Sequence, residues 1–257
     1  MNSRAVTLKV GQYPTWCVAH RGFSARYPEN THAAFEAALA EPIQAMELDI
    51  QLSRDDVPVI YHNRTLHLVG GGRRRPRTQT LAALQGYDYG AWFGPEYHGQ
   101  TLVLLHEVLS RYGRETVLLL EIKRRERLRS RLEKTMALTL ELVHRYGLAS
   151  RCYLLCYDLD LLAYGHALAP ACRFVVNQDI GRFLPEARFL SGYSVAVGGL
   201  DPALVRQAHG AGKPVFTFTC DRPSQLNHAL GCGVDAVMAN DPSWLAKALR
   251  SRGVNDA

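Results

Sequence analysis

The types and spacing of Glu47 and Asp49 suggest chemistry. These two residues alternate with Met46, Leu48 and Ile50, a pattern typical of a β-strand. Because strand side chains repeat every second residue, both carboxylates project from the same face. Buried carboxylates without a partner are strongly unfavourable, so we expect a cation at this face. A hairpin with a solvated acidic face would give the same pattern, and the other motifs decide between the two.

Four more polar residues lie at the ends of apolar runs that are typical of strands. His20 ends the run TWCVAH and His62 follows VPVIY, while Glu121 and Lys123 end the run TVLLLEIK. Imidazole ordinarily titrates near neutral pH and therefore suits proton transfer. Taken singly, a histidine at a strand end is more often a capped or surface residue. Glu121 with Lys123 would likewise be explained by a salt bridge alone.

The composition is that of an ordinary globular protein. With 257 residues, of which 47% are hydrophobic and 21% charged, the chain can form one large α/β domain, which we favour over two small ones. No apolar run approaches the roughly 18 residues of a transmembrane helix. Residues 1–12 lack the apolar core of a signal peptide. We therefore expect a cytoplasmic protein without a transmembrane segment.

The cysteines indicate the redox state of the thiols, and the charge distribution indicates the kind of substrate or partner. The six cysteines form no CxxC pair and mostly fall within apolar runs, which favours buried reduced thiols over a metal site or a disulfide framework. The net charge of +6 suits an anionic substrate. Basic residues cluster only at Arg73–Arg75 and Arg77, which we interpret as a solvated loop, with a phosphate or a peripheral anionic-membrane contact as the alternative. No basic and aromatic stripe of the kind that binds nucleic acid is present.

Strand-like and helix-like segments alternate along the chain, which predicts a parallel sheet covered by helices. Eight parallel strands indicate a closed (β/α)8 TIM barrel, whose functional residues gather at the carboxyl ends of the strands. An open doubly wound sheet would normally carry a Gly-rich phosphate motif after its first strand, and none is present. The single domain would span residues 1–257, with an inserted lobe over residues 63–101 after the second barrel strand. The predicted barrel strands are Thr15–His20, Ala45–Leu52, Thr116–Ile122, Arg151–Cys156, Cys172–Val176, Tyr193–Val197, Pro214–Thr219 and Val234–Ala239. The predicted helices are His32–Glu41, Leu102–Tyr112, Glu126–Tyr146, Leu159–Leu168, Ile180–Phe189, Pro202–Ala211, Pro223–Leu230 and Pro242–Arg250.

Several motifs, in this order and spacing, resemble those of the glycerophosphodiester phosphodiesterase family. They are AHRG, PENT, MELD, VIYHN and LEIK. The similarity is closest over Val18–Asn63 and continues through Leu105–Leu109 and Leu120–Lys123. The resemblance implies a TIM barrel that cleaves glycerophosphodiesters to sn-glycerol 3-phosphate and an alcohol.

The resemblance also implies roles for the acidic residues and the histidines. Glu47, Asp49 and Glu121 would bind one divalent cation. Oxygen ligands without cysteine or histidine favour Mg²⁺ or Ca²⁺ over zinc. His20 and His62 would be the general acid and base, one neutral while the other is charged.

Further residues carry over from the same resemblance. Arg21 and Lys123 would stabilise the negative charge that builds on the phosphoryl oxygens in the transition state. Phe216 stands where the family usually has a tryptophan that packs on the glycerol, so it would form the substrate wall. Glu29 would support these groups from the start of the first helix. Asn63 stands where the family usually has Asp, and its amide supplies hydrogen bonds but no charge beside the second histidine.

Two other functions compete with this reading. A phospholipase D-like activity on lysophospholipids or sphingomyelin would use the same metal and histidines, and an apolar rim near Trp92 and Phe93 would suit it. The second is a barrel that binds phosphodiesters without hydrolysing them. Asn63 favours this binding function, but the retention of both histidines argues against it, because binding alone needs no acid and base pair.

Overall fold

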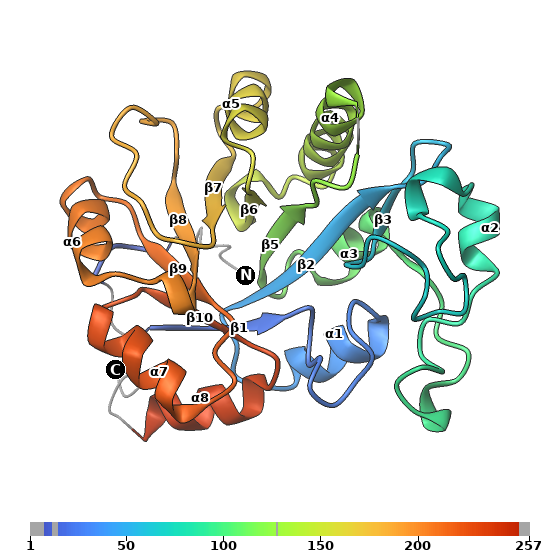
Figure 1. Cartoon of the computed structure of the whole chain (residues 1–257), viewed down its shortest axis with the longest axis horizontal. Helices are drawn as coiled ribbons and strands as arrows, with labels where there is room; N and C mark the ends of the chain where they lie inside the picture. The colour runs from blue at the N-terminus through green and yellow to red at the C-terminus, as the bar shows by residue number, and fades with distance from the viewer. Residues whose placement is uncertain (1–7, 12–14, 127, 252–257) are drawn as a thin grey trace.

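Eight parallel strands close into a barrel in the computed structural model, which describes residues 8–11, 15–126 and 128–251 (Figure 1). Neighbouring strands pair in the order β1-β10-β9-β8-β7-β6-β5-β2, and β1 also pairs with β2, which closes the ring. The predicted (β/α)8 TIM barrel is thereby confirmed. The barrel strands are β1 (Trp16–His20), β2 (Ala45–Leu52), β5 (Val117–Ile122), β6 (Cys152–Cys156), β7 (Arg173–Gln178), β8 (Gly192–Ala196), β9 (Val215–Phe218) and β10 (Ala236–Ala239).

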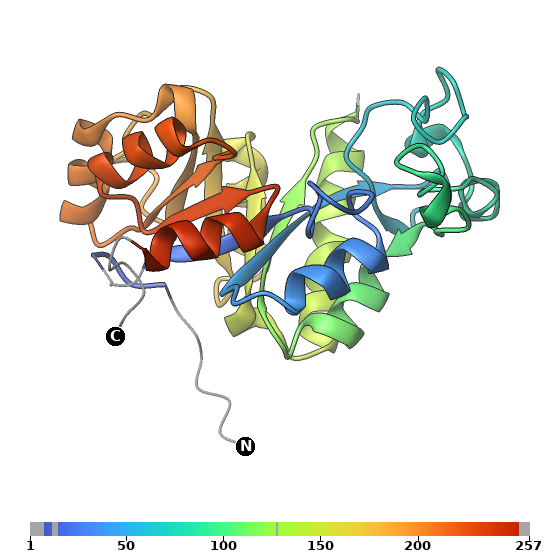
Figure 2. The ribbon, with the colours of Figure 1, turned by 90° about the horizontal axis from the view of Figure 1, so that it is seen from below.

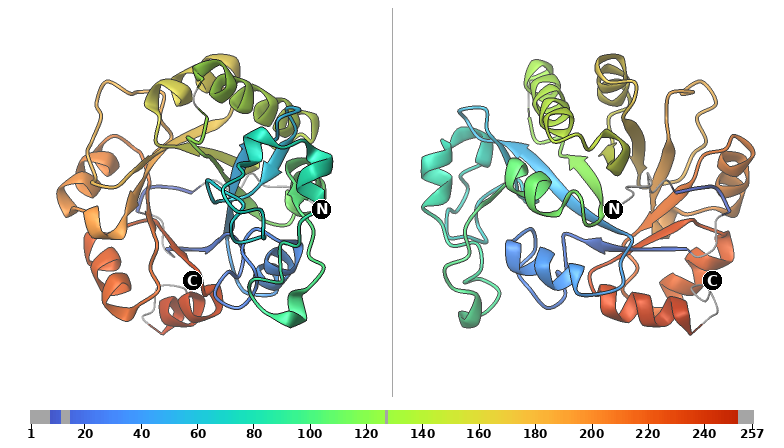
Figure 3. Two further views of the ribbon diagram at one scale, coloured as in Figure 1. Left: turned by 45° about the vertical axis from the view of Figure 1, so that its right-hand side comes forward. Right: turned by 180° about the vertical axis from the view of Figure 1, so that it is seen from behind.

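Helices connect most of the barrel strands and surround the barrel on its outside (Figure 3). Their bounds agree with the predicted segments to within a few residues, apart from one segment between β7 and β8. In the part of the chain that the structure describes, no helix combines the length and apolar character needed to cross a membrane. The helices around the barrel are α1 (His32–Leu39), α3 (Leu105–Tyr112), α4 (Arg129–Arg145), α5 (Leu159–Leu168), α6 (Pro202–Gly210), α7 (Pro223–Cys232) and α8 (Pro242–Arg250).

The connection between β7 and β8 is an irregular loop, so the helix predicted over Ile180–Phe189 was wrong. Pro185 lies in the middle of that segment. It cannot donate a helical hydrogen bond, and it disfavours helical geometry at the residue before it. The Gln178 side chain instead accepts a hydrogen bond of 2.8 Å from the backbone N–H of Arg182, which helps to fix the start of the loop.

A lobe lies beside the barrel between β3 (Pro58–Ile60) and β4 (Val103–Leu104) (Figures 1 and 2). These two short strands pair antiparallel, and β3 also pairs antiparallel with the end of β2. The lobe contains α2 (Leu81–Gln85) and two 3₁₀ turns. Its assignment as an insertion within one domain stays a prediction, and the ends of the predicted domain lie outside the described residues. The lobe has a small core of its own, made of Val59, Tyr61, Leu66, Val69, Leu84, Tyr89, Leu102 and Leu104.

Side chains of the barrel strands alternate between the barrel interior and the layer of helices. On β2, Ala45 packs in the interior, whereas Met46, Leu48 and Ile50 pack under the helices. Because inward positions recur every second residue, the later inward residues of the same strands lie at the carboxyl ends. The polar residues at these ends therefore lie above an apolar plug. The plug consists of Leu8, Trp16, Val18, Ala45, Val117, Leu119, Tyr153, Leu155, Val175, Phe216, Ala236 and Met238. The six cysteines are free and buried, as predicted.

Candidate active site

Three carboxylates meet at the carboxyl ends of β2 and β5. These two strands are parallel neighbours, and their register places Asp49 opposite Glu121. Glu47 lies two residues earlier on β2 and faces the same way. Carboxylate oxygens of Glu47, Asp49 and Glu121 lie within 4.8 Å of one another. Strand pairing therefore brings together acids that are far apart in the sequence.

Burial and neighbouring charges shift the pKa values of these three acids in different directions. Burial, together with the charges of Asp49 and Glu121, raises the pKa of Glu47 well above its ordinary value. Burial also raises the pKa of Glu121, against the effect of the nearby Lys123. For Asp49, burial acts in the same direction, but the positive charges of Lys123 and Arg21 outweigh it and lower the pKa. Asp49 is the acid whose charge the protein itself neutralises.

The residues present fit a divalent cation. Glu47 Oε1 is buried and has no hydrogen-bond partner among the described residues, so one hard oxygen donor is left unused. Glu47, Asp49 and Glu121 are the group of His, Cys, Asp and Glu side chains in the described chain whose ligand atoms are close enough to hold an ion. Three carboxylate oxygens without a soft donor suit Mg²⁺ or Ca²⁺.

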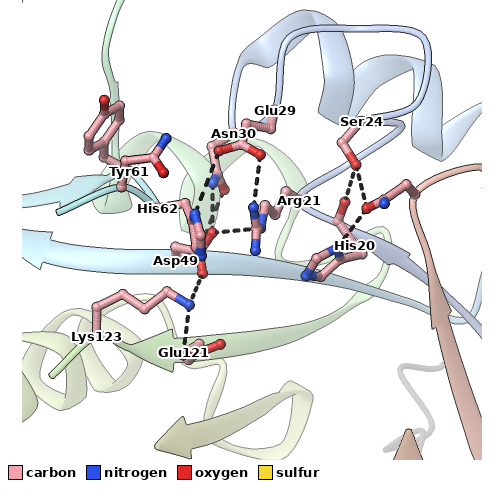
Figure 4. A network of polar contacts seen from close by, with 12 residues as sticks. His20, Arg21, Ser24, Glu29, Asn30, Asp49, Tyr61, His62, Glu121 and Lys123 are labelled. Atoms are coloured by element: carbon pink, nitrogen blue, oxygen red, sulfur yellow. Dashed lines mark hydrogen bonds and ion pairs between the residues drawn. The ribbon is translucent and has the colours of Figure 1, made fainter. Parts of the chain in front are cut away.

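Asp49 is also the centre of a network of polar contacts (Figure 4). Arg21 Nε lies 3.2 Å from Asp49 Oδ2, and Lys123 Nζ lies 2.8 Å from Asp49 Oδ1. Asn30 donates a hydrogen bond of 2.8 Å to Asp49 Oδ2. Arg21 also pairs with Glu29 at 2.8 Å, and Lys123 with Glu121 at 2.8 Å. These contacts fix both cations beside the acids.

The backbone at the end of β1 turns sharply to bring Arg21 into this network. Arg21 has a φ of 58°, which is uncommon for a residue with a side chain. Gly22 follows with a φ of 78°, and a Cβ at that position would lie 2.7 Å from the backbone of Ala34. A close approach of the chain to α1 therefore requires this glycine.

The His20 ring is oriented by residues from the ends of β9 and β10. His20 Nδ1 lies 2.7 Å from Asn240 Oδ1. The Asn240 amide in turn donates to Asp221 Oδ2 at 2.7 Å, and the Asn240 backbone N–H donates to Asp221 Oδ1 at 2.8 Å. On the other side of the ring, Nε2 lies 3.8 Å from Glu47 Oε2. Burial, and next the charge of Arg21, lower the pKa of His20 to about 3.

His62 lies on the other side of Arg21 from His20 (Figure 4). Its Nδ1 lies 3.9 Å from Glu29 Oε1. Burial lowers the pKa of His62 to about 4; the charge of Asp49 opposes this effect and those of nearby cations add to it. The structure thus brings both predicted histidines, both predicted cations and the three predicted acids to one end of the barrel.

The proposed substrate wall at Phe216 needs correction. Phe216 is completely buried in the apolar plug, where its ring packs against Tyr153 with centroids 5.5 Å apart. It lies near the start of β9, and a side chain at that depth cannot touch a substrate at the barrel mouth. The next inward residue, Phe218, ends the strand and is only partly buried. On β9, Phe218 is the aromatic residue at the mouth.

Other supporting residues are placed as follows. Glu29 contacts both Arg21 and His62, as expected of a supporting group. The carbonyl of Asn63 accepts a hydrogen bond of 2.9 Å from Gln51 and so holds the loop that follows β3.

Sequence reasoning missed Asp221 and the role of Asn240. It assigned Asn30, like Glu29, a supporting role near the start of α1; Thr31 provides the helix cap, accepting from the N–H of Ala34. The available signal was the position of Asn240 at the end of a strand-like run.

Comparisons with known proteins point to one family. Residues 20–243 match the model of the glycerophosphoryl diester phosphodiesterase family. The chain is 28% identical to a glycerophosphodiester phosphodiesterase of Caldanaerobacter subterraneus subsp. tengcongensis, over 93% of this chain and 99% of that protein. It is 29% identical to a probable glycerophosphodiester phosphodiesterase of Mycobacterium tuberculosis, over 89% of this chain and 91% of that protein.

Solved structures have the same fold. A phosphodiesterase of Oleispira antarctica, in complex with its product sn-glycerol-3-phosphate, matches with a TM-score of 0.81 and 28% identity, covering 91% of this chain and 96% of that chain. A putative glycerophosphoryl diester phosphodiesterase of Silicibacter pomeroyi matches with a TM-score of 0.86 and 24% identity, covering 96% of this chain and 97% of that chain.

Proposed function

Because this chain belongs to the glycerophosphoryl diester phosphodiesterase family, we propose that it hydrolyses glycerophosphodiesters to sn-glycerol 3-phosphate and an alcohol. We further propose that Glu47, Asp49 and Glu121 hold one divalent cation, Mg²⁺ or Ca²⁺, and that His20 and His62 transfer the protons. The single observation that carries this proposal is the convergence of three carboxylates, within 4.8 Å of one another, beside two imidazoles at the barrel mouth.

The geometry around His20 supports its role as the base in the first step. Asp221 only accepts hydrogen bonds, so the Asn240 NH₂ group must face Asp221 and the Asn240 oxygen must face His20. The neutral His20 ring then carries its proton on Nδ1, which leaves a lone pair on Nε2. Nε2 would take the proton of the glycerol hydroxyl next to the phosphate as that oxygen attacks phosphorus.

His62 would act as the acid in the same step. Its proton would pass to the oxygen of the leaving alcohol as the bond between that oxygen and phosphorus breaks, which yields a cyclic glycerophosphate. A pKa of about 4 means that His62 is neutral in the substrate-free protein. The proton it donates would therefore be taken up with the anionic substrate, whose charge favours imidazolium. Water would then open the cyclic phosphate, with the two histidines exchanging roles.

Arg21 and Lys123 would stabilise the phosphoryl oxygens. Each is anchored by two carboxylates, so little conformational entropy remains to be lost when substrate binds. A divalent cation bound by the three acids would polarise the phosphate and offset its charge. Glu29 would support Arg21 and His62 without touching the substrate. Phe218, in place of Phe216, would offer the apolar wall for the glycerol.

The test is a phosphodiesterase assay that follows release of sn-glycerol 3-phosphate with and without EDTA. We expect hydrolysis that chelation abolishes and that added Mg²⁺ or Ca²⁺ restores. Full activity in EDTA would remove the metal assignment, and a substrate without the attacking hydroxyl that is cleaved equally fast would remove the cyclic intermediate. A lysophospholipid in the same assay would test the predicted phospholipase D-like alternative, and cell fractionation would test the predicted cytoplasmic location.

A further inference from the structure

We propose that the cavity beside His62 binds the leaving alcohol and selects an alcohol that carries an anionic group, such as a carboxylate or a second phosphate. This inference rests on the proposed function, because it concerns the group that His62 would protonate. The cavity has a volume of about 410 Å³ and opens at the carboxyl ends of β5, β6 and β7. His62, Glu121 and Lys123 form the side of the cavity that belongs to the reaction centre.

The position of the cavity assigns it to the leaving alcohol. His20 lies on one side of Arg21, and His62 lies on the other (Figure 4). The glycerol hydroxyl that attacks phosphorus must face the base, His20. The leaving oxygen must be displaced on the opposite side, where the acid is. His62 lines the cavity, so the rest of the leaving alcohol extends into it.

Two arginines that line the cavity, Arg124 and Arg125, are at most weakly paired within the described residues. No carboxylate of the described residues pairs with Arg125, and its buried Nε has no hydrogen-bond partner there. Arg124 lies 3.8 Å from Asp158 and is 58% exposed, so this contact is weak. Asp158 is in addition bound by Arg129 at 3.1 Å and caps α5. Both guanidinium groups therefore keep donors for an anion.

Asp179 is the carboxylate of the cavity lining that lies outside the reaction centre, and its charge is partly committed. The Tyr157 hydroxyl donates a hydrogen bond of 3.1 Å to Asp179 Oδ1. Lys123 is already neutralised by Asp49 and Glu121. The other carboxylate that lines the cavity, Glu121, is paired with Lys123. With a divalent cation bound by the three acids, two weakly paired guanidinium groups therefore stand against the carboxylate of Asp179, and the cavity favours an added negative charge. A trimethylammonium group, which cannot donate hydrogen bonds and is repelled by both arginines, fits it poorly.

Two pairs of substrates isolate this effect. Glycerophosphoserine differs from glycerophosphoethanolamine by one carboxylate, and glycerophosphoinositol 4-phosphate differs from glycerophosphoinositol by one phosphate. We expect kcat/KM of the full chain with Mg²⁺ to be higher for the more anionic member, by about tenfold, equivalent to about 1.4 kcal/mol. The comparison between the two pairs distinguishes carboxylate from phosphate as the preferred group.

Matched variants test whether Arg124 and Arg125 cause the preference for the more anionic substrate. The double variant R124Q/R125Q should bring the ratio within each pair close to one. The control R206Q/R182Q removes the same two charges from residues that do not line the cavity, and it should keep the ratios of the unmodified protein. Circular dichroism would verify that both variants fold.

Each outcome decides between the two proposals. Equal kcat/KM values within both pairs, or a preference for the less anionic members, would overturn the anionic-alcohol site and leave the proposed function intact. Equal loss of the preference in the control variant would also overturn it, since that loss would reflect the net charge of the protein. If none of the four substrates is hydrolysed, the proposed function itself fails, and this inference fails with it.

Discussion

Replacing Glu47 with Gln should abolish the stabilisation of this protein by a divalent cation and should make the metal-free protein more stable. Glu47 is buried among like charges, and one of its oxygens has no partner among the described residues. Glutamine has nearly the same shape and removes the charge, so the repulsion from Asp49 and Glu121 disappears. The same change removes one of three ligands. Stability and ion binding should therefore change in opposite directions.

The expected effect of the ion is measurable by thermal unfolding. At about 100 times its Kd, a ligand that binds only the folded state stabilises it by about 2.7 kcal/mol. For a chain of this size, about 1 kcal/mol corresponds to roughly 2–4 °C in Tm. The unmodified protein should thus gain about 5–10 °C on addition of Mg²⁺ or Ca²⁺, and E47Q should gain little.

The pH dependence of the same shift has a definite sign. The pKa of Glu47 and that of Glu121 are raised in the folded protein. Above the ordinary pKa of a glutamate, the folded state then binds more protons than the unfolded state, and stability falls as pH rises towards the folded pKa. A cation removes this loss. The ion-induced increase in Tm should therefore be larger at about pH 8 than at about pH 5.

The measurement needs a control carboxylate close to the site. Glu29 pairs with Arg21 but is not one of the three ligands, so E29Q should keep the ion-induced shift. The reasoning is refuted if E47Q keeps the same shift as the unmodified protein, or if E29Q and E47Q lose it equally.

Three further changes test the rest of the site and core. Asn240→Leu should lower kcat by about 10–100-fold with a smaller effect on KM, because a buried group left without its partner costs roughly 1–3 kcal/mol. Asp221→Asn still offers an acceptor and should cost much less; equal losses in steady-state kinetics would contradict this account. Phe216→Ala should lower the free energy of unfolding by about 3–5 kcal/mol, which denaturant titration would measure. Phe218→Ala should mainly raise KM, which steady-state kinetics would measure. The buried thiols should resist a thiol reagent until the protein unfolds, because burial raises the pKa of residues such as Cys17 to about 12; rapid labelling of the folded protein would contradict it.

The barrel and its acids were predictable because they depend on local periodicity. Alternation on β2 determines that Glu47 and Asp49 face the same way whatever they pair with. Counting apolar runs gave eight strands, and the barrel rule then placed their polar ends together. The one wrong helix lay where Pro185 breaks the backbone pattern. Local periodicity therefore predicted the barrel strands and the helices around them, apart from the segment that Pro185 interrupts.

Contacts across the barrel were not predictable in the same way. The contact between His20 and Asn240 joins positions 220 residues apart, and it depends on the closure of β1 onto β10. The depth of a residue in the barrel depends on strand register, which is why Phe216 was mistaken for the residue at the mouth. A shift of two residues along a strand keeps the facing of a side chain but moves it from plug to rim.

The charge balance of the site indicates why a divalent ion suits it better than a monovalent one. Arg21 and Lys123 link Glu29, Asp49 and Glu121 in one network, and Glu47 accepts a hydrogen bond from the backbone N–H of Arg21. With both histidines neutral and all four acids ionised, four carboxylates against two cations leave two negative charges above the apolar plug. Such an excess is costly at low dielectric, and one Mg²⁺ or Ca²⁺ balances it. A monovalent ion would leave one carboxylate to be protonated, which would remove a ligand from the set.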